Sequence, residues 1–403
     1  MLKAWRQIFQ PCRRLHFQAV IRYARYGTVN LQAFNPVKVV HVISGDLWAG
    51  AEAQAATLLT QLSQQPDVSV TAIVLNHGEL ARRLISLDIA VVVLDEQKLS
   101  PPAIFFKLLG LLQGLQPDVV HTHRIKENIL ASLAATIVTP AKGVRTVHGS
   151  AEHSLKGWRK LPSRLLAGLD SWCGAHLQSA TIAVSQELGE TLVRQFPKHN
   201  VVVIENGVAT NPTPDHDAPP AWKTLNPVAL HVGIAGRLVP VKRLDIFIDM
   251  AAQLTRRNPG CWQFHVFGDG SQRSQWVERV VALGLAQQIL FHGQVPNLSS
   301  QLRGLDALII CSDHEGLPMV ALEALAVQLP VLAHAVGGLL DLLDEPLLIS
   351  DNRARCYADK LTHLLHSRAH AGEPLAIVKL PVQYTADYNA RQVFNLYARL
   401  LAE

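Results

Sequence analysis

The sequence predicts an α/β protein made of two doubly wound domains, each with a parallel sheet. Its 403 residues exceed what one ordinary hydrophobic core accommodates, so we expect two domains. Short runs of β-branched residues alternate with longer helical patterns, which favours parallel strands joined by right-handed crossovers. Between the two halves, residues 211–227 contain five prolines and are typical of a linker.

The first half, residues 37–210, begins with a run of apolar and β-branched residues that predicts a buried strand. The same alternation of strand and helix patterns continues to the linker. We expect strands over Val37–Ile43, Val68–Leu75, Ile89–Leu94, Val119–His121, Gly143–His148, Ile182–Val184 and Val201–Glu205, and helices over Ala51–Leu62, Glu79–Leu87, Ala103–Leu115 and Asn128–Thr136.

The second half, residues 228–403, repeats the rhythm. We expect strands over Val228–Gly236, Trp262–Phe267, Ile289–Phe291, Ala307–Cys311, Val331–Ala333 and Leu347–Ile349, and helices over Leu244–Thr255, Gln272–Leu283 and from Pro318 through Ala326. Pro318 suits the first turn of that last helix. Two such domains predict a ligand cleft at the carboxyl ends of the strands.

Residues 1–36 form a basic amphipathic extension with six Lys or Arg and no acidic residue, interleaved with apolar side chains. Such a segment can lie on an anionic membrane surface or serve as a transit peptide; a disordered tail and a misassigned start are the alternatives. No apolar run reaches the roughly 18 residues of a spanning helix. We predict a cytoplasmic protein, with peripheral contact to the inner face of the cytoplasmic membrane.

The common nucleotide motifs are incomplete. Gly45–Gly50 has the spacing of a phosphate loop, but Ala51 and Glu52 stand where Lys and Ser or Thr are required. Gly268 and Gly270 follow a strand without the third glycine of a dinucleotide fingerprint. The net charge of +5 is concentrated at the N-terminus, so we expect no nucleic-acid partner.

Metal binding has weak support in the sequence. The five cysteines are scattered and predict reduced thiols without a zinc site. Asp215 and Asp217 lie in the linker and are interpreted as solvated. His121 and His123 would face the same side of a strand and could form a metal pair, but packing or substrate contact is the favoured interpretation because no third ligand is near in sequence.

Lys242 and Arg243 lie where a helix is expected to begin, at the positive end of its dipole, which is mildly unfavourable for cations. A bound anion would remove this conflict: the helix end, Lys242 and Arg237 could together hold a diphosphate. The alternative is ordinary surface charge, compensated locally by Asp245. Charge and position alone do not decide between the two.

Two carboxylates mark the next strand-to-helix connection. Glu315 lies in the loop, where Gly316 permits close backbone approach. Glu323 lies about one and a half turns into an apolar helix, where an unpartnered carboxylate is costly. Its partner would be a backbone amide, a neighbouring Arg, or the hydroxyl pair of a ribose.

With these residues in view, the sequence resembles the retaining glycosyltransferases of the GT-B fold, family 4. Glu315-Gly-Leu-Pro with Glu323-Ala-Leu-Ala resembles the E-x7-E signature of that family. Other segments match in order: Gly50-Ala-Glu52, Pro117-Asp-Val-Val-His-Thr-His123, Thr146-Val-His-Gly149, Asn206-Gly-Val208, Gly236-Arg-Leu with Lys242, Gly268-Asp-Gly270, Phe291-His-Gly293 and Gly337-Gly338. The resemblance covers about residues 37–350.

The resemblance implies a GT-B architecture, a nucleotide-sugar donor and no catalytic metal or cofactor. By the same resemblance, Arg237 and Lys242 would bind the donor diphosphate, Glu323 the ribose and Glu315 the sugar hydroxyls. His148 would lie near the reacting carbon. The remaining donor-binding residues would be Gly50, Gly236, Gly268, Gly270, Gly316 and Leu317. The domains would be an acceptor-side domain over 37–210 and a nucleotide-sugar-binding domain over 228–403, whose last helix would pack back on the first domain.

Ala49, Gln328 and Asp341 depart from the family pattern and put donor and acceptor preference in doubt. The expected activity is hexosyl transfer with retention to an acceptor hydroxyl, in envelope polysaccharide or glycolipid assembly. The alternatives are a nucleotide-sugar epimerase of the same fold and a non-catalytic sugar-nucleotide-binding protein. The base, sugar, acceptor, linkage and oligomeric state are not determined by the sequence.

Overall fold

The computed structural model describes residues 35–45, 48, 50–148, 163–197, 199–210, 220–295, 297–371 and 379–403. The basic extension up to residue 34, Ala49 and residues 211–219 of the predicted linker lie outside the described residues. Residues Pro36–Glu403 form one compact unit. Among the described residues, no helix is long and apolar enough to cross a membrane.

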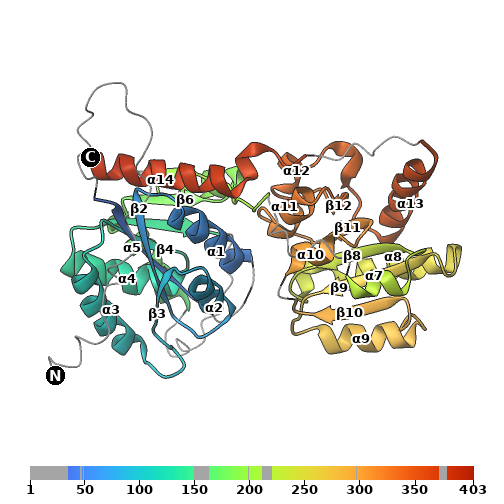
Figure 1. Ribbon diagram of the computed structural model, residues 1–403, viewed down its shortest axis with the longest axis horizontal. Coiled ribbons are helices and arrows are strands. Elements are labelled where there is room, and N and C mark those ends of the chain that lie inside the picture. The colour runs from blue at the N-terminus through green and yellow to red at the C-terminus, as the bar shows by residue number, and fades with distance from the viewer. Residues whose placement is uncertain are drawn as a thin grey trace, which may run out of the picture. The chain divides into compact units, whose positions relative to one another are not determined.

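The first half forms a parallel sheet of seven strands in the order β3-β2-β1-β4-β5-β6-β7 (Figure 1). Every pair in it is parallel, as the crossover pattern predicted. The strands are β1 Val37–Ile43, β2 Val68–Val74, β3 Ala90–Val93, β4 Val119–Thr122, β5 Lys142–Val147, β6 Ala180–Ala183 and β7 Val201–Val203.

Helices connect these strands, and four of them match the predicted helices within a few residues. They are α1 Gly50–Ser63, α2 Glu79–Ser86, α3 Pro101–Leu115 and α4 Ile125–Val138. Two more, α5 Ser163–His176 and α6 Gln186–Gln195, were not among the predicted elements. The Ser185 side chain caps α6 by accepting from the Leu188 amide, a signal that the sequence did contain.

The second half forms a parallel sheet of six strands in the order β10-β9-β8-β11-β12-β13. Its strands are β8 Leu230–Ala235, β9 Trp262–Phe267, β10 Ile289–Gly293, β11 Ala307–Ile310, β12 Val331–His334 and β13 Leu348–Ile349. Its helices are α8 Leu244–Arg257, α9 Arg273–Ala282, α10 Leu298–Leu302, α11 Met319–Ala326, α12 Leu339–Leu342 and α13 Ala354–Ala371. The two sheets are therefore the two doubly wound Rossmann-like layers that the sequence predicted.

Residues 220–227 differ from the irregular linker that was predicted. A short helix, α7 Ala221–Leu225, begins directly after Pro220, where a proline is compatible with a helix start. Its Trp222 ring lies over the His265 ring, with 3.9 Å between ring centroids. This part of the linker therefore packs on the second sheet.

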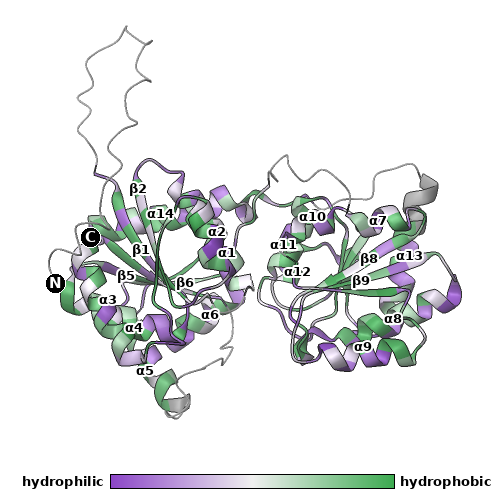
Figure 2. Ribbon diagram, turned by 60° about the horizontal axis from the view of Figure 1, so that its bottom comes forward, coloured by the Kyte–Doolittle hydropathy of each residue, from purple (hydrophilic) through white to green (hydrophobic). Residues whose placement is uncertain are grey.

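The last helix, α14 Ala386–Ala402, belongs to the core of the first sheet although it follows the second sheet in the chain (Figure 1). Val393, Tyr397 and Leu400 are buried in one cluster with Val39 of β1. The central strands of both sheets are mostly apolar (Figure 2), as expected for parallel strands covered on both faces. The two faces of β1 alternate, since Val39 contacts the α14 side and Val40 the α3 and α4 side.

Candidate active site

The second sheet changes direction of winding between β8 and β11, which are hydrogen-bonded neighbours. In open parallel sheets, ligands bind in the crevice outside the carboxyl ends of the strands at such a switch point. Gly236 and Arg237 follow β8, and Ser312 and Glu315 follow β11. The fold therefore brings together two of the segments that the sequence singled out.

The loops after β8 and β9 approach each other closely. Gly236 and Gly268 have backbone φ angles of +147° and +125°, in a region that side chains rarely adopt. A Cβ atom on Gly268 would lie 2.0 Å from the carbonyl oxygen of Gly236, and one on Gly270 would lie 2.5 Å from that of Leu238. These glycines are required for the shape of the rim.

Another segment of the chain closely approaches the loop at Glu315 and Gly316. A Cβ atom on Gly316 would meet no described atom closer than 4.0 Å, but the Gly338 amide donates to the Gly316 carbonyl at 2.7 Å, so the backbones do approach each other there. A Cβ atom on Gly337, at φ +55°, would lie 1.8 Å from the Glu315 carbonyl oxygen. The turn at Gly337 therefore packs closely against the loop that contains Glu315.

Lys242 and Glu315 form an ion pair at this rim. The Lys242 Nζ atom donates to Glu315 Oε1 at 2.5 Å, and the Ser312 hydroxyl donates to the same oxygen at 2.5 Å. The Glu315 side chain is only 9% exposed and that of Lys242 is 26% exposed. No described residue hydrogen-bonds to Glu315 Oε2, so one carboxylate oxygen is held while the other is left for a ligand hydroxyl.

A small pocket lies over this pair. Its polar lining brings together the half-buried Arg237 with Lys242, Ser312 and Glu315. Two cations at the carboxyl end of a strand can hold an oxyanion such as a phosphate. Among the predicted diphosphate ligands, Arg237 and Lys242 therefore line one pocket.

Arg243 is engaged elsewhere, as the surface-charge alternative predicted for it. It adopts the left-handed conformation at φ +49° and directly precedes α8, after a 3-10 turn over Pro240–Lys242. Its guanidinium donates to Asp245 and to Asp313 at 2.8 Å. These two carboxylates hold the pKa of Arg243 above its usual range. Of the two neighbouring cations Lys242 and Arg243, only Lys242 lines the pocket.

Glu323 lies in α11, half-buried among apolar side chains. Desolvation raises its pKa to about 7, while the charge of Arg83 acts in the opposite direction. No described residue donates a hydrogen bond to it. A carboxylate in this state gains from a hydroxyl-bearing ligand, which agrees with the functional interpretation of this residue.

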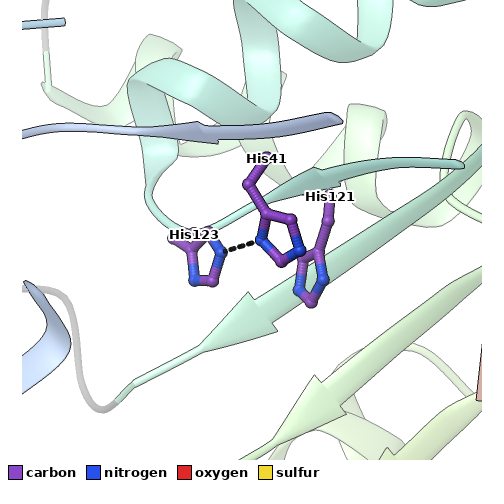
Figure 3. A group of neighbouring side chains, drawn as sticks. All are labelled: His41, His121 and His123. Atoms are coloured by element: carbon purple, nitrogen blue, oxygen red, sulfur yellow. Dashed lines mark hydrogen bonds between the residues drawn. The ribbon is translucent and has the colours of Figure 1, made fainter. Parts of the chain in front are cut away.

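His148 follows β5 of the first sheet and ends a chain of buried imidazoles. Its Nε2 lies 3.1 Å from His123 Nδ1, and His123 Nε2 lies 3.0 Å from His41 Nδ1. Figure 3 shows His41, His121 and His123 grouped together, with a hydrogen bond between His41 and His123. The sequence placed His121 and His123 on one face of a strand but missed His41. Pairing of His41 with His121 in the sheet register brings it there.

These three histidines are the group of described residues best placed to hold a metal ion, with ligand atoms within 4.8 Å of one another. However, each of their six ring nitrogens already lies within hydrogen-bonding distance of a neighbour. A metal ion would have to displace several of these contacts. The donor set therefore fits a hydrogen-bonded chain better than a metal centre.

The other predicted donor-binding residues occupy varied positions. Gly50 begins α1, and a Cβ atom there would lie 3.6 Å from the Met319 side chain. Leu317 is buried in the core of the second sheet. The His148 carbonyl oxygen is the nearest atom to a Cβ built on Gly316. Sequence reasoning missed Ser312, whose hydroxyl donates to Glu315, and it named the Gly337-Gly338 turn without its close approach to Glu315.

The two parallel-sheet domains define a GT-B-type fold, and comparison with known proteins identifies the family. Residues 48–211 match the family model Glycosyltransferase Family 4, and residues 229–367 match the model Glycosyl transferases group 1. The chain belongs to the group 1 glycosyltransferases.

Curated relatives match parts of the chain. The 2-deoxystreptamine N-acetyl-D-glucosaminyltransferase of Streptomyces fradiae is 31% identical over 241 residues, covering 56% of each chain. The lipopolysaccharide core biosynthesis mannosyltransferase LpsB of Rhizobium meliloti is 28% identical over 214 residues, 49% of this chain and 61% of that protein. The chain thus spans less than two thirds of either relative.

Solved structures match nearly the whole chain. Anabaena Alr3699/HepE in complex with UDP and glucose superposes with a TM-score of 0.72 at 18% identity, covering 90% of this chain and all (100%) of that one. Sucrose-phosphate synthase from Thermosynechococcus elongatus gives a TM-score of 0.67 at 16% identity, covering 91% and 99%. At these identities the likeness establishes the GT-B fold.

Proposed function

We propose that this protein is a retaining glycosyltransferase that moves a sugar from a nucleoside diphosphate sugar to an acceptor hydroxyl. The observation that carries the proposal is the Lys242–Glu315 ion pair, set in the pocket at the β8–β11 switch point beside Arg237. The family of the chain, and the UDP held by the HepE structures, support a nucleotide-sugar donor.

The two cations supply what the leaving group needs. As the bond to the sugar breaks, negative charge develops on the departing diphosphate, and preorganised positive charge there lowers the barrier. Arg237 and Lys242 are proposed to bind that diphosphate, and the half-buried Glu323 to bind the ribose hydroxyls.

Retention is proposed from the state of Glu315. Its Oε1 is already held by Lys242 and Ser312, so the carboxylate is suited to accept from a sugar hydroxyl. Retaining hydrolases that form a covalent sugar adduct use a pair of carboxylates, whereas the described lining of this pocket contains one, Glu315. The acceptor hydroxyl would then attack on the face from which the diphosphate leaves.

The acceptor is proposed to be a glycan or glycolipid of envelope polysaccharide assembly. The relatives support this class: one is a lipopolysaccharide core biosynthesis mannosyltransferase, and another is the poly(ribitol-phosphate) alpha-N-acetylglucosaminyltransferase of Staphylococcus aureus. Residues 1–36 would supply peripheral contact with the cytoplasmic membrane. No metal is expected to take part.

Ligand-dependent thermal stability tests the donor assignment. We expect one nucleoside diphosphate among UDP, GDP, ADP and CDP to raise the melting temperature, with NAD as the negative comparison. A ligand at 100 times its dissociation constant stabilises the folded state by about 2.7 kcal/mol. The shift should disappear in Lys242→Ala and persist in Lys98→Ala, which removes a lysine from an exposed pair with Asp95.

Product analysis then separates transfer from the alternatives. Transfer predicts nucleoside diphosphate release that depends on an acceptor, and an anomeric configuration that NMR shows to be unchanged. Conversion of the nucleotide sugar to its epimer without an acceptor would replace the proposal with the epimerase. Binding without any turnover would leave a non-catalytic protein.

A further inference from the structure

The histidines beside His148 belong to a continuous hydrogen-bonded chain of six side chains. From Thr146, contacts of 2.7 Å and 2.5 Å lead through the two ring nitrogens of His121 to the Tyr397 hydroxyl. From that hydroxyl, a contact of 3.3 Å leads to His41 Nε2. The contacts through His123 then end at His148 Nε2.

The chain is buried and carries no net charge. His41, His121 and Tyr397 are fully buried, and His123 is 4% exposed. Burial lowers the pKa of His41 to about 3 and holds the pKa values of His121 and His123 well below 6.5. Each imidazole is therefore neutral near pH 7 and carries one proton, on one of its two nitrogens.

With one proton on each ring and one on each hydroxyl, only two patterns satisfy every contact along the chain and also use the Tyr397 proton in one of them. In the first, the Thr146 hydroxyl donates to His121 and all protons point toward His148, so that all four rings carry hydrogen on Nδ1. In the second, every proton points the other way and all four rings carry hydrogen on Nε2. A mixed pattern leaves two donors or two acceptors facing each other, or makes the Tyr397 oxygen accept twice and leaves its own buried proton without an acceptor, which is costly in a buried site.

Both ends of the chain open on one pocket. Thr146 and His148 line a small pocket between α1, the first sheet and α14. His148 Nδ1 is buried there with no hydrogen-bond partner among the described residues, and the same holds for the oxygens Gln54 Oε1 and Asn206 Oδ1. A small pocket with unpaired polar atoms on several walls is suited to a single ligand hydroxyl or an ordered water.

The orientation of Gln54 is determined by its neighbours. Asn389 of α14 donates through its amide nitrogen to the Glu205 carbonyl at 2.6 Å, so its oxygen faces Gln54. Gln54 Nε2 donates to that oxygen at 3.1 Å, which leaves Gln54 Oε1 directed away from α14 as an acceptor. Gln54 Oε1 is therefore a hydrogen-bond acceptor in the pocket that His148 also lines. His148 is the end of the histidine chain whose Nδ1 carries hydrogen in one pattern and not in the other.

We propose that the chain Thr146–His121–Tyr397–His41–His123–His148 is a two-state tautomer relay that lets His148 act as either donor or acceptor toward a sugar hydroxyl without gaining charge. Tyr397 is the positioning residue that couples the two ends, because its hydroxyl alone joins His121 to His41. The inference rests on the proposed sugar transfer for its ligand, while the tautomer pattern stands on the contacts themselves.

The first test reads the tautomers directly. Protein labelled with ¹⁵N-histidine is examined by long-range ¹H–¹⁵N correlation NMR at pH 7, free and with UDP-glucose, and variants such as His148→Gln assign the signals. We expect His41, His121, His123 and His148 to share one tautomer in each state. A mixed pattern, an imidazolium among the four, or stoichiometric zinc in the purified protein would overturn the relay.

The second test cuts the chain at its centre. Tyr397→Phe keeps the ring packing but removes the hydroxyl, so His148 should no longer share the tautomer of His121. We expect kcat/KM for transfer to fall about 3- to 10-fold, the equivalent of one net hydrogen bond. Tyr357→Phe is the matched control, because it removes a buried hydroxyl that bonds to Ile310 and Asn352 in the second domain.

The two proposals fail in distinguishable ways. Loss of stability in both tyrosine variants with unchanged kcat/KM and an unchanged His148 tautomer would make Tyr397 structural and overturn the relay. A wild-type protein that binds no nucleoside diphosphate and transfers no sugar would overturn the proposed function. The shared tautomer of the four histidines would still be read by NMR in that case.

Discussion

Each sheet of this protein contains a chain of histidines, and the two chains differ in how they end. In the first sheet, the chain from His121 to His148 passes through the Tyr397 hydroxyl and begins at Thr146. In the second sheet, His231 Nδ1 contacts His265 Nε2 at 2.9 Å, and His265 Nδ1 contacts His292 Nε2 at 2.9 Å. There the far nitrogen of His231 contacts the Asn226 carbonyl at 2.8 Å.

A carbonyl accepts hydrogen bonds and cannot donate them, so it fixes the direction of the second chain. His231 must carry hydrogen on Nε2, and the same then holds for His265 and His292. Hydroxyl groups donate and accept, so the first chain keeps both directions. Burial lowers the pKa in both chains, to about 2 for His265, and neutrality is therefore common to both. The difference shows that the groups at the ends of a histidine chain, rather than the histidines, decide whether it can switch.

Position separates the two chains as well. His231 is the second residue of β8, near the amino end of that strand, and Trp222 of α7 covers the chain. His148 follows β5 at its carboxyl end, where ligands bind in such folds. We interpret the second chain as structural. The charged rim formed by Lys242 and Glu315 takes the ligand-binding position in that half.

We expect the greatest loss of activity when the ion pair between Lys242 and Glu315 is removed. Lys242→Ala should lower kcat/KM for transfer by about 100- to 1,000-fold, because a preorganised charge at the leaving group is lost. Glu315→Ala should have a similar effect, since it also leaves Lys242 unpaired. Circular dichroism and thermal unfolding check that both variants fold, and Lys98→Ala is the control. Wild-type rates in a folded variant would remove these residues from the site.

Substituting the last histidine of each chain tests whether the two chains differ in function. His148→Gln should lower kcat/KM by about 10- to 100-fold if its imidazole bonds to the reacting sugar. His292→Gln, at the end of the second chain, should leave kcat/KM within about 2-fold. Steady-state kinetics on both variants measure this contrast. Equal losses would contradict the division into a functional and a structural chain.

A smaller effect is expected in the pH dependence of stability. The pKa of Glu323 is about 7 in the fold and 4.5 in the reference state, so the folded protein holds a proton that the unfolded chain releases. Stability from this group is complete below pH 4.5 and is lost as pH rises to 7. Glu323→Gln should therefore raise the free energy of unfolding at pH 8 by about 1–2 kcal/mol relative to wild type.

Urea unfolding at pH 5 and pH 8 gives this comparison, with the difference between proteins shrinking at the lower pH. The same variant should bind the nucleoside diphosphate more weakly if Glu323 holds the ribose. Unchanged affinity would return Glu323 to a structural role. The buried histidines respond in the opposite sense: their pKa values are lowered, so their contribution is present above pH 6.5 and lost as pH falls.

Local patterns predicted much of the fold and part of the site. Runs such as Val37–Ile43 and Trp262–Phe267 are apolar throughout because parallel strands are covered on both faces, and their lengths mark them as strands. Glu323 stood out as a carboxylate in an apolar helix, and the structure leaves it half-buried among apolar side chains. α5 was missed because it has no clear apolar face, whereas α6 was missed although it is amphipathic and is preceded by the capping Ser185.

Strand periodicity, glycine turns and motif spacing are local properties of the chain, and they predicted the two-sheet α/β architecture and singled out Lys242 and Glu315. Which of these residues meet depends on how the whole chain packs. Lys242 reaches Glu315 because β8 and β11 are neighbours at the switch point, although 73 positions separate the two residues. Tyr397 joins the histidine chain because α14 returns to the first sheet after the whole second sheet has formed. The order of the strands and the packing of α14 on the first sheet depend on how the whole chain is buried. No local sequence pattern predicts them.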